Sequence, residues 1–245
     1  MTRVDTLKNG CKIIQDDKGF CFGVDALLLC AFSRIKLGQK AIDLGSGNGI
    51  IPIVMKKKSE ALRSSHVKEE CHFTGLEIQG TAAELAKKSV KLNGFEKSVS
   101  IVQGDIRNVK NLFEAQSFDA VFSNPPYMKV QGSKESLGKE KRIARHEILC
   151  GVEDIAAAAS YLLKPNGTFF MIHRPFRLQE IFEALSANKM AVRRARLVHP
   201  FFDKAPEMIL LEAKKNYKKD LKFEPPLVMY EGREYSKNFL DYCGL

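Results

Sequence analysis

Short apolar runs and amphipathic stretches alternate through most of the chain. The apolar runs predict buried strands at 40–44, 73–77, 99–103, 118–123, 168–173, 192–198 and 208–213. The stretches between them predict helices at 50–58, 81–92, 153–163 and 177–188, where the second helix is stopped by Asn93-Gly94. Strands that alternate with helices indicate an α/β fold built on a doubly wound, mainly parallel sheet.

The N-terminal part differs from this alternating region. Residues 7–22 contain short β-like runs broken at Asn9-Gly10, and residues 25–32 predict a helix. We interpret residues 1–36 as a small β/helix cap on a main domain that spans 37–215.

The C-terminal residues 216–245 form a basic tail, which contains most of a lysine cluster at 214–222 and includes Pro225-Pro226. Because prolines and charges interrupt any apolar period, we expect this tail to lie in irregular form on the surface of the main domain. A chain of 245 residues requires no second core.

Composition narrows the class of protein. The longest early apolar run, 26–32, is far shorter than the ~20 residues of a membrane helix, and no leader-like segment precedes it, so we expect a cytoplasmic protein. Six cysteines are scattered without a C-x-x-C pair, and we expect neither a metal site nor a disulfide framework. The excess of 39 Lys and Arg over 29 Asp and Glu favours a polyanionic partner such as nucleic acid.

A glycine-rich segment, Asp43-Leu44-Gly45-Ser46-Gly47-Asn48-Gly49, follows the first core strand. Glycines at a strand-to-helix turn let the backbone approach a ligand. The third glycine comes one residue too early for a dinucleotide fingerprint, and an acidic residue stands two positions before the first. The pattern favours S-adenosylmethionine, a cationic cofactor without phosphate, with Asp43 near its methionine end and room made by Gly45, Gly47 and Gly49. A tight turn without a ligand is the alternative.

Two further carboxylates end the next two strands, at the same edge of the predicted sheet. Glu77 closes the second strand, where it can accept hydrogen bonds from both ribose hydroxyls. Asp105 closes the third strand, where it could accept from the adenine amine while Ile106 packs on the ring. A structural helix cap is the alternative for Asp105.

The segment Ser123-Asn124-Pro125-Pro126-Tyr127 closes the fourth strand. An aromatic amine is a poor nucleophile because its lone pair is delocalised into the ring. The Asn124 side chain and the Pro125 carbonyl can accept its two hydrogens and hold the nitrogen in line with a methyl donor. Pro126 stiffens the loop, and Tyr127 offers a face for stacking an extruded base. We therefore predict methyl transfer to a planar amine; a proline-rich turn is the alternative.

Basic residues gather after this segment. Residues 129–145 hold six basic and two acidic side chains, so an RNA backbone could pass there; a solvated loop is the alternative. Arg193, Arg194 and Arg196 would extend this surface if they share its face. The residues that we expect to bind RNA are Lys129, Lys141, Arg142, Arg145, His146 and Arg196.

Along nearly its whole length the chain resembles the bacterial valine-tRNA adenine-N6-methyltransferases. The motifs that carry the resemblance lie at 22–29, 43–51, 75–79, 124–127, 144–147, 198–200, 210–213 and 225–227. It implies the seven-stranded class I methyltransferase sheet with its last strand antiparallel, and methyl transfer from S-adenosylmethionine to an adenine beside the anticodon of a valine tRNA. It also implies that Asp25 and Asn124 contact the cofactor. The chain departs from the family at Phe201-Phe202 and in a long polar insertion at 56–71.

Three other functions remain open. An enzyme that methylates the glutamine amide of release factors also uses Asn-Pro-Pro-Tyr on this fold, although a protein substrate gives no reason for a basic loop beside the site. A guanine-N2 methyltransferase of ribosomal RNA is a second rival. A non-catalytic RNA-binding scaffold is a third, which intact Asp43, Glu77 and Asn124 argue against. The sequence fits a monomer or a homodimer equally.

Overall fold

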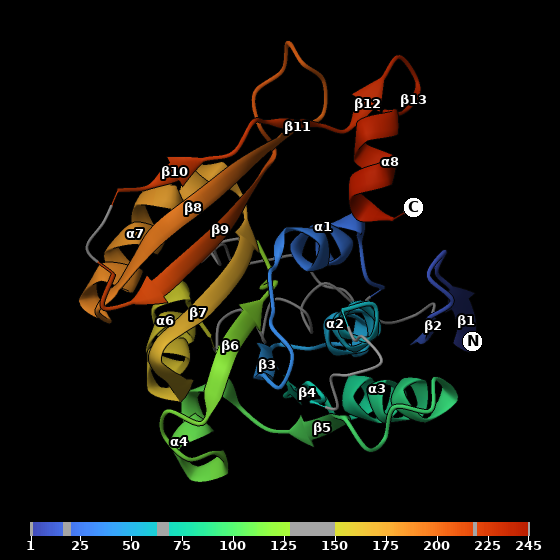
Figure 1. The fold of residues 1–245 in the computed structure, drawn as a ribbon, viewed down its shortest axis with the longest axis vertical. Helices are drawn as coiled ribbons and strands as arrows, with labels where there is room; N and C mark the ends of the chain where they lie inside the picture. Colours follow the sequence, from blue (N-terminus) through green and yellow to red (C-terminus); the bar gives the residue numbers. More distant parts are fainter. Residues whose placement is uncertain (1, 17–20, 63–68, 128–149, 218–219, 245) are drawn as a thin grey trace, which may run out of the picture.

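The computed structural model describes residues 2–16, 21–62, 69–127, 150–217 and 220–244. A nine-stranded sheet forms its centre, in the order β10-β8-β9-β7-β6-β3-β4-β5, with β11 also paired to β8 (Figure 1). The strands are β3 (Lys40–Leu44), β4 (His72–Glu77), β5 (Val99–Gln103), β6 (Phe118–Ser123), β7 (Leu163–His173), β8 (Met190–His199), β9 (Met208–Lys215), β10 (Lys222–Phe223) and β11 (Leu227–Val228).

Strand directions bring most strand ends to one edge of the sheet. Strands β3 to β7 run parallel, and β9 is antiparallel to both of its neighbours, β7 and β8. The strand β8 therefore points the same way as β7. The carboxyl ends of β3 to β8 meet at one edge, which is the ligand side of such sheets. The predicted core of seven strands with an antiparallel last strand is confirmed.

Helices cover both faces of the sheet (Figure 1). Along β7, Phe170 and Ile172 pack into one core, whereas Phe169 and Met171 pack into the other, as expected for side chains that alternate along a strand. The first core is covered by α1 (Val24–Phe32), α2 (Ile50–Glu60) and α3 (Gly80–Leu92), and the second by η1 (Ile106–Asn108), α4 (Val109–Leu112), α6 (Val152–Leu162) and α7 (Leu178–Ala187). The short helix η2 (Pro175–Arg177) leads into α7.

The strand β7 begins five residues before the predicted start. Phe118 of β6 pairs with Leu163, yet Ala120 pairs with Thr168, so the residues between these two partners bulge out of the ladder. Asn166 in the bulge has a φ of 62°. The residues between the predicted helix and the predicted strand therefore form an irregularity inside β7.

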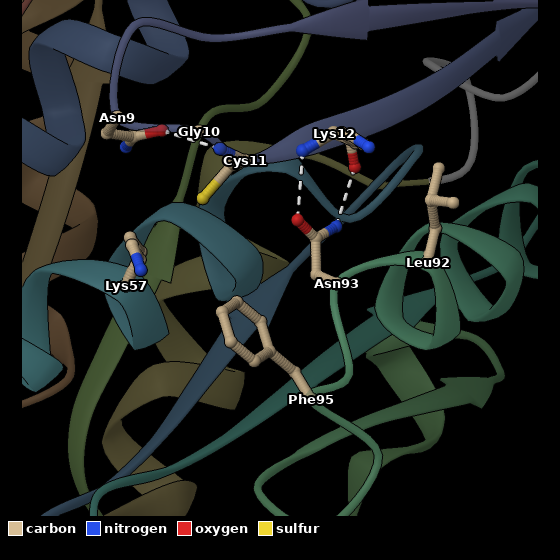
Figure 2. A pocket seen from close by; sticks show the side chains of 8 residues that line it. All are labelled: Asn9, Gly10, Cys11, Lys12, Lys57, Leu92, Asn93 and Phe95. Atoms are coloured by element: carbon tan, nitrogen blue, oxygen red, sulfur yellow. Dashed lines mark hydrogen bonds between the residues drawn. The ribbon is translucent and has the colours of Figure 1, made fainter.

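The N-terminal residues form a hairpin of β1 (Thr2–Thr6) and β2 (Lys12–Asp16). Its first strand starts before the predicted β-like region. The Asn93 side chain, at the end of α3, accepts from the Lys12 N–H at 2.9 Å and donates to the Lys12 carbonyl at 2.7 Å (Figure 2). Ile14 N–H donates to Ser89 Oγ at 2.9 Å. These bonds attach the hairpin to α3.

The prediction of an irregular tail was wrong. The strands β10 and β11 pair in parallel with β8, and a hairpin of β12 (Tyr230–Glu231) and β13 (Glu234–Tyr235) leads to α8 (Lys237–Cys243). Leu227 and Phe239 are fully buried in the first core. Two-residue strands show no alternation that a sequence pattern could reveal. Within the described ranges, none of the helices is both long and apolar enough to cross a membrane.

Candidate active site

The glycine-rich segment forms the turn between β3 and α2, at the carboxyl edge of the sheet. The N–H groups of Gly45 and Ser46 donate to the Leu76 carbonyl at 2.9 and 3.0 Å, which ties the turn to β4. Gly45 has a φ of +81°, and a Cβ placed on it would meet no described atom within 4 Å. This position therefore needs glycine for its backbone and opens onto free space.

Asp43 lies directly beneath this turn. It is 1% exposed, and neither carboxylate oxygen has a hydrogen-bond partner among the described residues. Burial raises the pKa of Asp43 to about 8, with a smaller contribution from the Glu77 carboxylate, although the nearby Ser46 hydroxyl acts in the opposite direction. A buried carboxylate without a partner is the group that a cationic ligand would stabilise.

Glu77 is also buried, but both of its oxygens already have donors. The Gly47 N–H donates to Oε2 and the Gln79 N–H donates to Oε1, each at 2.8 Å. Glu77 therefore holds the glycine turn in place, and each oxygen keeps a lone pair for a further donor. Its predicted contact with a ribose remains a prediction.

Asp105 has the helix-cap arrangement that the sequence allowed. Its side chain accepts from the Arg107 N–H at 2.8 Å at the start of η1 and forms an ion pair with the Arg107 guanidinium at 2.5 Å. The hydrogen bond from this guanidinium lowers the pKa of Asp105. Ile106 follows it and is half-buried. The predicted adenine contact of both residues stays a prediction, in which Arg107 would compete for the carboxylate.

The Asn-Pro-Pro-Tyr segment lies one strand away from the glycine turn. The strand β6 pairs directly with β3, and Ser123 Oγ donates to the Leu44 carbonyl at 3.1 Å. Asn124 is half-buried, Pro125 is buried and Pro126 is exposed. The structure therefore brings the two predicted motifs together at neighbouring strand ends.

Tyr127 joins three elements. Its hydroxyl lies 2.7 Å from Asp25 Oδ2, on α1, and 2.7 Å from Asn124 Oδ1. Its ring packs edge-on against His173, with centroids 5.4 Å apart, and the Arg174 guanidinium lies 5.0 Å from the ring centroid. Burial and the Asp25 carboxylate raise the pKa of Tyr127. The predicted stacking face thus already carries a guanidinium.

The sequence analysis did not single out His173 and Arg174. Their position at the carboxyl end of a predicted parallel strand could have indicated that they lie at this edge. His173 is fully buried, and its Nδ1 accepts from the Arg174 N–H at 2.8 Å. Burial and the charge of Arg177 lower the pKa of His173 to about 4. The imidazole is therefore neutral at pH 7 and offers no charge to the site.

The predicted RNA-binding residues are only partly testable on the structure. Five of them, Lys129, Lys141, Arg142, Arg145 and His146, lie outside the described residues. Arg196 Nε donates to the Pro225 carbonyl at 2.9 Å, and its guanidinium lies 4.4 Å from the Tyr242 ring centroid. Arg196 therefore holds the C-terminal tail, and its contact with RNA stays a prediction.

The other two arginines of β8 pair with one carboxylate. A bulge places both Arg193 and Arg194 opposite Glu212 of β9, at 3.1 and 2.6 Å from its two oxygens. Arg194 also pairs with Glu224 at 2.7 Å and donates to the Phe32 carbonyl. Arg194 is buried and paired within the fold, whereas Arg193 remains partly exposed. Whether they extend a basic surface stays a prediction, because residues 129–145 lie outside the described residues.

A hollow of about 260 Å³ lies elsewhere, between the hairpin turn and the ends of α2 and α3 (Figure 2). Lys57, Asn93 and Phe95 line it. Helices that follow parallel strands run back across the sheet, so their last turns lie at its amino edge. This hollow is therefore far from the glycine turn. Among the described residues, no cluster of His, Cys, Asp and Glu could hold a metal ion.

Comparison with known proteins agrees with this arrangement. Residues 35–222 match the model of a family described as "Methyltransferase domain". Since the match spans most of the chain, the protein belongs to this methyltransferase family.

More specific relatives share a single name, "tRNA1(Val) (adenine(37)-N6)-methyltransferase". The protein of that name from Histophilus somni is 27% identical over 228 residues, which cover 93% of this chain and 90% of the relative. The one from Bacteroides fragilis is 25% identical over 218 residues, which cover 89% and 86%.

Solved structures show the same fold. A predicted O-methyltransferase from Agrobacterium tumefaciens superposes with a TM-score of 0.71 at 22% identity, covering 90% of this chain and 95% of that one. TrmN from Thermus thermophilus gives a TM-score of 0.52 at 19% identity, covering 78% and 48%.

Proposed function

We propose that this methyltransferase transfers a methyl group from S-adenosylmethionine to the exocyclic N6 amine of an adenine in tRNA. The observation that carries the proposal is the position of Asn124, at the end of β6 and one strand from the glycine turn and the unpaired Asp43. The target adenine would be adenine 37 of a valine tRNA, as in the name shared by the relatives. Such an enzyme would act in the cytoplasm, where tRNA is found.

The residues at the turn fit S-adenosylmethionine. The cofactor carries an ammonium and a sulfonium, and the buried Asp43 carboxylate forms no ion pair with a described residue and has only the nearby Ser46 hydroxyl as a potential donor. The space above Gly45 would receive its methionine part, and the remaining lone pairs of Glu77 would accept the ribose hydroxyls. When bound, the cofactor supplies a methyl group that is electrophilic because its sulfur is positively charged.

The Asn-Pro-Pro-Tyr segment would prepare the amine. Asn124 Oδ1 and the Pro125 carbonyl accept hydrogen bonds from the two N–H groups of the base amine. These bonds draw the nitrogen lone pair out of conjugation with the ring. Methyl transfer to this nitrogen would form the N–C bond at the expense of the cofactor's S–C bond, whose electron pair would stay on sulfur. The product nitrogen is then a cation that loses its proton to water, so the site requires no strong base.

Charge supports RNA over a protein substrate. The chain has a net charge of +10, and the glutamine amide of a release factor would not require it. Relatives that align over about nine tenths of this chain carry a tRNA name. A protein amide is therefore kept as an outcome of the test.

The test incubates the purified protein with S-adenosylmethionine and unmodified tRNA, then measures nucleosides by mass spectrometry. We expect N6-methyladenosine from the wild type and none from Asn124→Ala. Calorimetry should give the same cofactor affinity for both proteins, because Asn124 acts on the amine. Cofactor binding with no methylated nucleoside would redirect the search to protein glutamine, and no cofactor binding would favour a non-catalytic scaffold.

A further inference from the structure

Asp25 is the residue through which the N-terminal helix α1 reaches the catalytic segment. Its Oδ2 lies 2.7 Å from the Tyr127 hydroxyl, across 102 positions of sequence, and its Oδ1 accepts from the Ala26 N–H at 2.8 Å. Both oxygens thus have protein donors. Both oxygens of Asp43 have none among the described residues. Of the two carboxylates, Asp43 is the one left for a cationic cofactor.

The Tyr127 hydroxyl has one hydrogen but two acceptors, each 2.7 Å away. A carboxylate accepts more strongly than an amide, so the hydrogen goes to Asp25. The hydroxyl oxygen then presents its lone pairs to Asn124, and the Asn124 amide is best satisfied with its NH₂ group turned toward them. In this orientation the carbonyl oxygen of Asn124 points away from Tyr127 and can accept from a substrate amine.

The ring of Tyr127 is fixed from the opposite side of the site. His173 packs edge-on against it at 66°, and Arg174 lies over it. Arg174 is itself held by the Glu207 carbonyl, to which its Nη1 donates at 3.0 Å. Because the ring would lose these contacts if it turned, its hydroxyl stays at one place between Asp25 and Asn124.

Gly23 keeps space for the Asp25 carboxylate. Its φ of −101° is open to any residue, so the backbone does not require glycine here. A Cβ on Gly23 would stand 2.8 Å from Asp25 Oδ1, which is closer than van der Waals contact allows. The absence of a side chain at this position lets Asp25 adopt the rotamer that reaches Tyr127.

We propose that Asp25 is a positioning residue for methyl transfer, which acts through the Tyr127 hydroxyl to orient the Asn124 amide that receives the substrate amine. This inference rests on the proposed function and deepens it. It assigns Asp25 to the substrate side of the site, whereas the family resemblance assigned it to the cofactor.

The kinetic test compares Asp25→Ala, Tyr127→Phe and the double variant in the tRNA assay. Each single variant should lower kcat about 10- to 100-fold, which is the effect expected from a misplaced catalytic group. The double variant should be no slower than the slower single variant, because both changes break one chain of hydrogen bonds. Cofactor affinity by calorimetry should stay within about twofold of wild type. Asp25→Asn keeps an acceptor oxygen and should recover most of the lost kcat.

Two matched variants control for general loss of stability. Asp119→Ala removes a carboxylate that accepts from Lys40 N–H and Lys164 Nζ at the start of β6. Tyr161→Phe removes a hydroxyl that donates to the Phe113 carbonyl at 3.2 Å, in the last turn of α6. Both should lower the thermal unfolding temperature while leaving kcat near the wild-type value.

Two kinetic results would overturn the proposal. The first is a cofactor affinity at least tenfold weaker in Asp25→Ala, with effects on kcat that multiply in the double variant; Asp25 would then hold the cofactor independently of Tyr127. The second is a kcat for Asp25→Asn as low as that for Asp25→Ala.

A spectroscopic arm needs no substrate. In protein labelled with ¹³C at the tyrosine Cζ, the Tyr127 signal is identified by its loss in Tyr127→Phe. That signal should shift in Asp25→Ala and shift less in Asp25→Asn. An unmoved signal would overturn the contact itself. If the signal shifts in Asp25→Ala as expected but the wild type methylates no tRNA, the result would instead count against the proposed function.

Discussion

Buried carboxylates differ in their partners between the glycine turn and the flank of the sheet formed by β8 and β9. In the flank, the Glu212 carboxylate is 5% exposed and pairs with Arg193 and Arg194. At the turn, Asp43 is 1% exposed and has no hydrogen-bond partner among the described residues. Removing a carboxylate from water is costly unless a cation or donors compensate it. The carboxylate in the flank is therefore compensated within the fold, whereas the one at the turn is left uncompensated, as the proposed cofactor site would require.

The largest expected effect on stability comes from removing the paired carboxylate in the flank. Glu212→Ala should lower the free energy of unfolding by about 3–5 kcal/mol, because it leaves the buried Arg194 without its closest carboxylate. Urea denaturation measures this loss. Glu96→Ala, an exposed carboxylate change, should stay within about 0.5 kcal/mol. A loss under 1 kcal/mol for Glu212→Ala would show that the arginines reach solvent instead.

The glycine turn should respond to pH in the opposite sense from an ordinary paired carboxylate. Between the usual pKa of 3.8 and the raised value of about 8, folded Asp43 keeps a proton that the unfolded chain has lost. The folded state then binds more protons, so this group's contribution to stability falls as pH rises, by at most about 1.4 kcal/mol per pH unit. Asp43→Asn should lack this slope.

Urea midpoints of both proteins at several pH values across that window test the difference. The stability of Asp43→Asn should increase relative to that of the wild type as pH rises. The variant should nevertheless bind S-adenosylmethionine more weakly in calorimetry. Parallel curves of stability against pH for the two proteins would mean that Asp43 ionises normally. Its carboxylate would then be no less well stabilised than that of Glu212 in the flank.

The smallest effect separates two adjacent aromatic residues at the end of β8. The Phe201 ring packs against Tyr230 with centroids 5.6 Å apart, whereas Phe202 is 87% exposed. Phe201→Ser should cost about 0.5–1.5 kcal/mol, and Phe202→Ser should stay within about 0.5 kcal/mol. Thermal unfolding of the two variants side by side measures this. Equal losses would place Phe202 in a contact that the described residues do not show.

Patterns that depend on regular periodicity were predictable from the sequence. The strands β3 to β6 lie within one residue of their expected bounds, because each is a short, mainly apolar run closed by a polar or glycine-rich turn. The same runs end in Asp43, Glu77 and Asn124, so their common edge followed from parallel pairing alone.

Contacts between distant or irregular segments were not predictable. The bond between Asp25 and Tyr127 joins residues 102 positions apart and depends on how α1 packs. The pairing of Arg193 with Glu212 depends on a bulge that turns two successive side chains toward one partner. The Asp105 cap was an open alternative, since a carboxylate after a strand can serve a ligand or a helix equally well.

The insertion of β9 between β7 and β8 has a consequence for synthesis on the ribosome. The chain emerges in the order β7, β8, β9, but the sheet places β9 in the middle. Until Met208–Lys215 has left the exit tunnel, β7 presents a bare edge and β8 has no neighbour in the sheet. The nascent protein therefore depends on a late segment to close its sheet.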